Sequence, residues 1–206
     1  MSSDPFVSEV DFIIRIAGEA GEGVISCGEL FAKAASRTQY HVFTFITYPA
    51  EMKGGYSMIQ IRVRDNTIYS LGSKVDYLVA FNQRGYDRSI EDVRPGGVMY
   101  YDPDTVSPAE HEDIYCVPVP FTRIAKEKSG SDRSKNAVVQ GLLGYLFGVE
   151  KKVSAKLLTE RYGKKGSVLL DKNLVALEAG FAFGEEQKLE KRFKLSAGPP
   201  AKDNYM

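Results

Sequence analysis

A glycine-rich turn, set between a short apolar run and an amphipathic segment, places the strongest constraint on the fold. Residues 18–24 read Gly-Glu-Ala-Gly-Glu-Gly-Val, and apolar residues then recur at helical spacing as far as Ala35. Glycine is favoured where a chain reverses tightly or lets another backbone come close. We therefore expect a buried strand at 12–17, a tight turn and a helix in direct succession, which is the start of an α/β fold. The first N–H groups of that helix would point into the turn, where an anion is favoured.

The turn matches neither of the common nucleotide-binding motifs. Its glycines follow the order G-x-x-G-x-G, whereas the dinucleotide fingerprint is G-x-G-x-x-G with an acidic residue about 20 positions further on. The next apolar strand ends in Thr47-Tyr48-Pro49 without a carboxylate, and the turn lacks the Gly-Lys-Ser/Thr of a phosphate loop. Glu19 and Glu22 lie in the turn instead. Two interpretations stay open: a ligand-binding turn, or glycines that only let the helix pack on the strand.

Apolar patterning along the rest of the chain predicts strands that alternate with helices. Residues 58–64 alternate strictly, which predicts a half-exposed strand with Arg62 and Arg64 on its polar face, and 67–70 is expected to return as its hairpin partner. The other expected strands are 41–47, 76–81, 98–101 and 114–120, and the expected helices are 24–35, 84–93, 133–147, 151–162 and 168–191. This order predicts a three-layer α/β/α fold with a mostly parallel, mixed sheet of the Rossmann-like type.

Two of the expected helices carry packing signals. Gly141, Gly144 and Gly148 are spaced by three and four residues, which forms a small-residue face that permits close packing against another helix or subunit. In the last helix, the residues expected to point inward are Leu169, Leu170, Leu174, Leu177 and Phe181.

A second loop, 48–57, is expected at the same edge of the sheet as the glycine turn. It follows the second strand and contains Lys53 and the pair Gly54-Gly55. Ligands of open α/β sheets bind beyond the carboxyl ends of the strands. Lys53 is the residue of this loop that we expect to touch an anion, the alternative being a solvated loop lysine.

The length and the charge of the chain limit the classes of protein to which it can belong. With 206 residues, 43% of them hydrophobic and 26% charged, the chain suits one α/β domain over 1–192. Residues 193–206 contain Gly198-Pro199-Pro200 and are expected to be a linker to a following domain. Basic and acidic residues both number 27, so no net charge favours nucleic acid or a membrane. Residues 1–120 contain 17 acidic and 10 basic side chains, whereas residues 121–206 contain 10 acidic and 17 basic ones. The second part has the positive net charge, so it is where we expect an anion to bind.

The cysteine count limits the possible chemistry. Cys27 and Cys116 are the only cysteines, too few for an iron–sulfur or zinc site within this chain, and a reducing, cytoplasmic setting is the default. His41 and His111 stand alone in the sequence, so no catalytic residue is assigned. The longest apolar stretch, 137–149, is too short to span a bilayer.

Four segments in order resemble the gamma domain of the 2-oxoacid:ferredoxin oxidoreductases. They are Ile16–Val24, Tyr48–Ser57, Asp76–Asn82 and Pro95–Val98, and the resemblance extends over about 11–185. The motif Gly-Glu-Ala-Gly-Glu-Gly-Val is most similar to the form in which this domain begins the alpha subunit of the 2-oxoglutarate enzymes.

The resemblance implies a role in a larger enzyme. The family oxidatively decarboxylates 2-oxoacids, passing the acyl group to coenzyme A and the electrons to ferredoxin. Thiamine diphosphate and the iron–sulfur cluster would belong to partner alpha and beta subunits, because this chain has no motif for either. This domain would help to enclose coenzyme A over the thiamine centre, as part of an oligomer that binds neither nucleic acid nor membrane.

The resemblance also implies which residues face the ligand. The first set is the two loops, with Gly18, Glu19, Gly21, Glu22, Gly23, Lys53, Gly54 and Gly55, and the second set is Lys126, Arg133 and Asn136. The two carboxylates argue against direct phosphate cradling and could instead hold a neighbouring subunit or meet the neutral arm of the ligand. Two other functions stay open: a non-catalytic assembly domain of the same kind of complex, and a free-standing nucleotide-binding domain.

Overall fold

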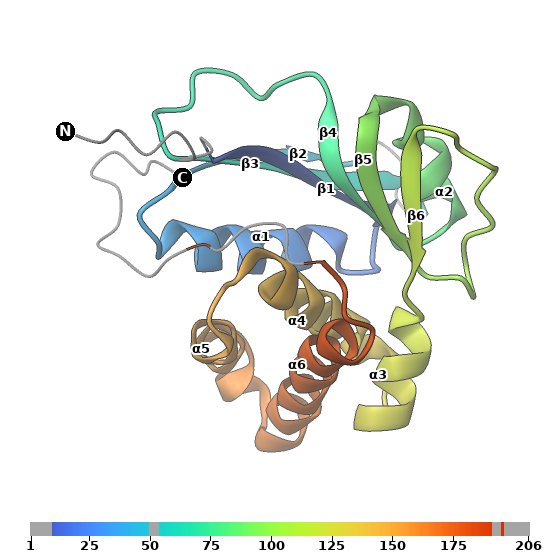
Figure 1. The fold of residues 1–206 in the computed structure, drawn as a ribbon. Helices are drawn as coiled ribbons and strands as arrows, with labels where there is room; N and C mark the ends of the chain where they lie inside the picture. Colours follow the sequence, from blue (N-terminus) through green and yellow to red (C-terminus); the bar gives the residue numbers. More distant parts are fainter. Residues whose placement is uncertain (1–9, 50–53, 191–194, 196–206) are drawn as a thin grey trace.

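The computed structural model describes residues 10–49, 54–190 and 195, which form one mixed six-stranded sheet with helices on both faces (Figure 1). The strand order is β2-β3-β1-β4-β5-β6. The strands are β1 (Asp11–Glu19), β2 (His41–Thr47), β3 (Tyr56–Arg64), β4 (Val75–Ala80), β5 (Val93–Tyr101) and β6 (Ile114–Pro118).

Strand β3 is the single antiparallel member of the described sheet. It pairs with β1 on one side and with β2 on the other, and β1, β4, β5 and β6 pair in parallel. Strands β1 and β2 therefore run in the same direction although they are not neighbours, and β2 and β3 form a hairpin. The mostly parallel, mixed sheet predicted from the sequence is confirmed.

Two expectations about β3 are wrong. Residues 67–70 form no strand, because both edges of β3 are already occupied by β1 and β2. The strand is also largely buried rather than half exposed. Arg62 is accommodated because its guanidinium binds both carboxylate oxygens of Asp11, at 2.9 and 2.8 Å. The same hydrogen bonds lower the pKa of Asp11.

The helices form two unequal layers, as Figure 1 shows. Five helices lie on one side of the sheet: α1 (Val24–Ser36), α3 (Phe121–Ser129), α4 (Lys135–Phe147), α5 (Lys151–Tyr162) and α6 (Ser167–Glu186). Of the described residues, the other side carries only α2 (Gln83–Asp87), the short 3₁₀ helix η1 (Ile90–Asp92) and connecting segments. The three-layer architecture is confirmed. Helix α3 was not predicted, because only Phe121 and Ala125 on it are buried and the segment otherwise reads as charged.

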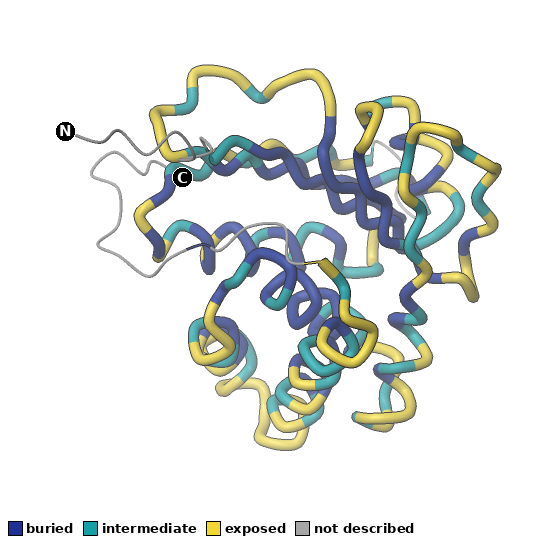
Figure 2. Tube along the Cα trace, in the orientation of Figure 1, coloured by how far each residue is buried: buried dark blue, intermediate teal, exposed yellow. Residues whose placement is uncertain are grey.

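The larger hydrophobic core fills the space between the sheet and α1 and α4 (Figure 2). Aromatic rings dominate its centre, where Phe147 of α4 stacks on Phe12 of β1 with ring centroids 4.9 Å apart. Leu195, beyond the expected domain boundary at 192, is also buried in this core, and its N–H donates to the Phe147 carbonyl at 2.9 Å. Among the described helices none is both long and apolar enough to cross a membrane.

Helices α4 and α6 pack so closely that glycines are required at their contact. A Cβ atom placed on Gly141 would lie 2.1 Å from the Leu177 carbonyl oxygen, and one on Gly180 would lie 2.0 Å from that of Val138. The small-residue face of α4 thus meets another helix of the same chain. Helix α6 presents Asn173, Ala176, Leu177, Gly180 and Gly184 as its buried residues. Leu169, which was expected to point inward, is exposed, because the glycine contact sets the rotation of α6.

Replacing Gly141 by alanine should therefore destabilise the fold. The added methyl group would press on the α6 backbone, which cannot move without displacing the helix, and we expect a loss of about 1–3 kcal/mol in the free energy of unfolding. Chemical denaturation followed by circular dichroism measures it. Gly163→Ala is the matched control, since a Cβ there meets its nearest atom at 3.9 Å. Equal stability of the two variants would contradict the close contact.

Candidate functional site

The carboxyl ends of β1 and β2 bring the two predicted loops together. The N–H of Ala20 donates to the Gly55 carbonyl at 3.0 Å. Arg84 of α2 bridges the loops as well, because it pairs with Glu19 at 3.8 Å and donates to the Gly54 carbonyl. The glycine turn and Gly54-Gly55 therefore leave the same edge of the sheet, as the sequence predicted. Lys53 lies outside the described residues.

The glycines of the turn have different roles. Gly23 has φ 81° at the N-cap of α1, and a Cβ there would lie 2.0 Å from Nδ2 of Asn136, so Asn136 packs directly against the turn. A Cβ on Gly18 would lie 2.7 Å from Oε2 of Glu22. Gly21 has φ 96° and its added Cβ would meet no atom within 4 Å. Gly18 and Gly23 thus serve close packing, whereas Gly21 faces open space.

Glu22 turns inward and connects three parts of the chain. Its Oε2 accepts hydrogen bonds from the backbone N–H of Glu19 at 2.8 Å and from Nδ2 of Asn82 at 2.6 Å. Its Oε1 accepts from Nζ of Lys135 at 2.8 Å, and that ammonium also lies 5.0 Å from the centre of the Phe81 ring. Both carboxylate oxygens are therefore hydrogen-bonded within this chain. Glu22 does not present an unpaired negative charge to a ligand in the cleft.

A cleft of about 390 Å³ lies between the glycine turn and the segment that follows β2. One wall is the turn and the first residues of α1, and the other is Tyr48 and Pro49. Its lining consists of Glu19, Ala20, Gly21, Gly23, Val24, Ile25, Ser26, Tyr48, Pro49 and Ser57. No side chain caps the N-terminus of α1, and its first turn contains no acidic residue. The cleft thus combines a helix N-terminus, which favours an anionic group, with walls whose one acidic side chain, Glu19, is paired with Arg84.

The structure separates the basic residues that are clustered in the sequence. Lys135 binds Glu22, and Arg123 pairs with Asp104 at 2.6 Å. Arg133 is exposed two residues before Lys135. Lys126 is exposed on α3, and no hydrogen bond or ion pair connects it to the described part of the glycine turn. Of the second predicted set, the structure brings only Asn136 into contact with the turn.

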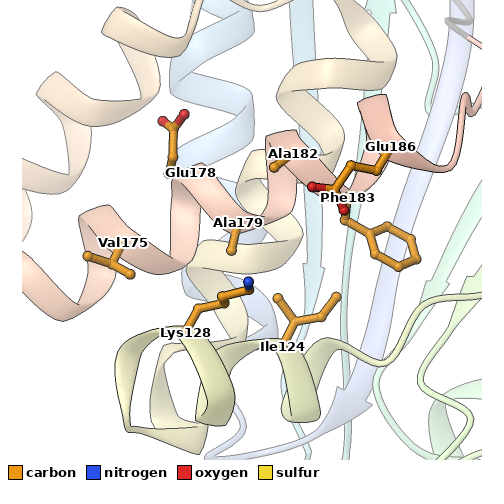
Figure 3. Close-up of a pocket in the computed structure, with 8 residues that line it drawn as sticks. All are labelled: Ile124, Lys128, Val175, Glu178, Ala179, Ala182, Phe183 and Glu186. Atoms are coloured by element: carbon orange, nitrogen blue, oxygen red, sulfur yellow. The ribbon is translucent and has the colours of Figure 1, made fainter.

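A second hollow, of about 420 Å³, lies between α3 and α6 (Figure 3). Figure 3 shows Ile124 and Lys128 of α3 opposite Ala179 and Ala182 of α6. Its lining is mostly apolar, and none of the predicted site residues belongs to it. Its three charged lining residues are Lys128 of α3 and Glu178 and Glu186 of α6.

The thiols and carboxylates do not form a reactive or metal-binding cluster in the described ranges. Cys27 is buried in α1, and burial raises the pKa of its thiol to about 12. Burial also raises the pKa of Cys116 on β6. Within 10–49, 54–190 and 195, no three His, Cys, Asp or Glu side chains lie close enough to hold a metal ion.

Sequence reasoning missed several residues of this site. Tyr48, Pro49 and Ser57 line the cleft, but they carry no charge that would single them out. Asn82 caps α2 by accepting from the Gly85 N–H at 2.9 Å, and it reaches Glu22 as well. Its place at the end of a buried strand predicted a polar group at this edge of the sheet, but not its contact with Glu22.

Comparisons with known proteins identify the family of this chain. Residues 13–183 match the family model described as pyruvate ferredoxin/flavodoxin oxidoreductase. The chain is 34% identical to 2-oxoglutarate synthase subunit KorC of Methanothermobacter thermautotrophicus over 84% of its own length and 94% of that protein. It is 33% identical to ketoisovalerate oxidoreductase subunit VorA of Methanothermobacter marburgensis, covering 86% of this chain but 37% of VorA.

A solved structure is similar over almost the whole chain. The 2-oxoglutarate:ferredoxin oxidoreductase of Magnetococcus marinus, solved with 2-oxoglutarate, coenzyme A and succinyl-CoA bound, superimposes with a TM-score of 0.84 and 38% identity. The match covers 94% of this chain and 34% of that one. The chain thus spans about a third of the longer relatives and nearly all of the KorC type, and the resemblance inferred from the sequence is confirmed.

The role of Glu22 can be tested against its neighbour Glu19. Glu22→Ala removes a carboxylate that is 24% exposed and leaves three donors without their acceptor, including Lys135, which is 15% exposed. We expect the free energy of unfolding to fall by about 1–3 kcal/mol. Glu19→Ala breaks one long ion pair between side chains that are 40% and 44% exposed, and should cost less than about 1 kcal/mol. Urea denaturation of both variants measures the difference, and a larger loss for Glu19→Ala would refute the central role of Glu22.

Proposed function

Because the chain belongs to the pyruvate ferredoxin/flavodoxin oxidoreductase family, we propose that it is the gamma-type part of a 2-oxoacid:ferredoxin oxidoreductase, with 2-oxoglutarate as the 2-oxoacid. In this role it helps to enclose coenzyme A over a thiamine diphosphate centre that partner subunits supply. The enzyme would oxidatively decarboxylate the 2-oxoacid, and ferredoxin would accept the electrons.

The observation that carries the proposal is the open N-terminus of α1 beside Gly21, facing the cleft between the two loops. Coenzyme A carries phosphate groups at one end and a long neutral arm that ends in a thiol. The helix N-terminus suits the anionic end, because its first N–H groups have no partner within the helix. The uncharged walls formed by Tyr48 and Pro49 suit the arm. Because Glu22 points inward, Glu19 is the acidic residue of the cleft lining, and it is paired with Arg84.

The chain's own residues are consistent with a covering role rather than a redox role. The two cysteines of these 206 residues fall short of the four that an iron–sulfur cluster needs, so we assign the electron carriers to partner domains. A domain that closes over coenzyme A contributes by placing the thiol correctly and by excluding water from the thiamine centre. The residues we assign to this contact are the cleft lining together with Lys53 and Gly54-Gly55.

The competing functions differ in what the cleft would bind. An assembly domain would contact only protein, so changes in the cleft would leave coenzyme A kinetics intact. A nucleotide-binding domain would bind NAD or ATP, which the glycine order and the missing ribose acid disfavour. Calorimetric titration with NAD and ATP separates this last function from the other two.

Tyr48→Ala tests the cleft in the assembled complex. The side chain is 68% exposed, so its removal should leave the fold intact while removing one wall. We expect the KM for coenzyme A to rise by about three- to tenfold with the KM for 2-oxoglutarate unchanged, which corresponds to about 0.7–1.4 kcal/mol. Tyr69→Ala is the matched control, because Tyr69 is 91% exposed and lies outside the lining. Unchanged coenzyme A kinetics for Tyr48→Ala would favour the assembly domain.

The same assay on Lys53→Ala tests the expected anion contact of the second loop. Loss of the ammonium should raise the coenzyme A requirement and leave 2-oxoacid binding unaltered, because the acid's pocket would lie in another domain. The effect should weaken with added salt if the contact is electrostatic. Kinetics identical to those of the unaltered enzyme would clear Lys53 of this role.

A further inference from the structure

Strand β2 is an edge strand without the features that normally prevent edge-to-edge pairing. Among the described residues it pairs with β3 on one side only. Its seven residues, His-Val-Phe-Thr-Phe-Ile-Thr, contain no proline, lysine or acidic residue. Natural proteins usually protect an exposed edge with such residues, with bulges or with very short strands. A seven-residue, regular and uncharged edge is therefore available for another strand.

The opposite edge of the same sheet is protected. Strand β6 has five residues and ends at Pro118, and Pro120 follows soon after it. Proline cannot donate to a sheet ladder, so it blocks pairing at that end. Of the two edges of the described sheet, only β2 therefore lacks a protecting proline.

The side chains of β2 are almost symmetric about Thr44. A phenylalanine stands on each side of it, at positions 43 and 45, and a β-branched apolar residue stands next, Val42 on one side and Ile46 on the other. In an antiparallel pairing of two copies about a two-fold axis through Thr44, Phe43 of each copy would oppose Phe45 of the other. Val42 would likewise oppose Ile46. Each pair is apolar, and no like charges meet, so the strand is complementary to itself.

The exposure of the aromatic rings agrees with such pairing. Phe43 is 41% exposed and Phe45 is 43% exposed, on the thinly covered side of the sheet. Val42 and Ile46 point to the other side and pack against the main core. Pairing two copies would join four phenylalanine rings into one cluster, and cross-strand aromatic pairs stabilise a sheet.

We propose that β2 is a self-association surface, through which two copies of this chain pair antiparallel about Thr44 and join their sheets into one. The interface is isologous, because each copy contributes the same strand. The contact is a short strand pair rather than a standard-sized interface, so the dimer is weak and depends on protein concentration. This inference does not depend on the proposed enzymatic function, and its test measures no activity.

Placing a charged residue at position 44, on the proposed two-fold axis, tests both the dimer interface and the register of the strand pairing. Sedimentation velocity over about a hundredfold range of concentration should show a monomer–dimer equilibrium for the unaltered chain. Thr44→Lys and Thr44→Glu each place like charges opposite one another, so each alone should dimerise at least about tenfold more weakly. An equimolar mixture of the two variants should recover the dimer, because opposite charges then meet at the axis.

The recovery in the mixture also shows that both variants fold. Phe45→Lys, at an exposed position, gives a second route to the same loss of dimer without touching the half-buried Thr44. Tyr115→Lys, on the protected edge β6, is the control and should dimerise like the unaltered chain. A chain that stays monomeric at every concentration, a dimer that survives in both Thr44 variants, or a dimer lost in Tyr115→Lys would overturn the proposal.

Discussion

The carboxylate of Glu22 connects the strand ends to the helical layer, and the geometry of the cleft depends on it. It fixes the turn after β1 through the Glu19 N–H, the turn after β4 through Asn82, and the start of α4 through Lys135. Three segments that are distant in sequence are thereby held at one point. Because the partly buried lysine and the carboxylate neutralise each other there, the adjacent helix terminus keeps its positive end free of a competing protein charge.

The glycines of the turn have two different roles around this carboxylate. Gly18 and Gly23 allow Glu22 and Asn136 to approach the turn closely, which makes the turn rigid. Gly21 is left facing the cleft, where a side chain would obstruct a bound group. A rigid frame with one open position suits the proposed covering role, since little ordering is then needed on binding.

Local features of the sequence predicted the frame of the site, and long-range pairing decided the rest. The strand, glycine turn and helix at 12–35 follow from local pattern, and so does the common edge of the two loops. The pairing of 67–70 with β3 was wrong, because no local signal shows that β1 and β2 occupy both sides of β3. Likewise the inward turn of Glu22 depends on Asn82 and Lys135, which are distant in sequence. Lys126 belongs to a helix that its charged composition concealed.

The insertion of β3 between β1 and β2 has a consequence for how this domain can diversify. The segment after β2 is the connection of a hairpin, so residues can be added or removed there without shifting the register of either strand. The glycine turn opposite it has no such freedom, because Gly18 and Gly23 are confined by packing. The length of one wall of the cleft can thus change, while close packing at Gly18 and Gly23 holds the other wall in place.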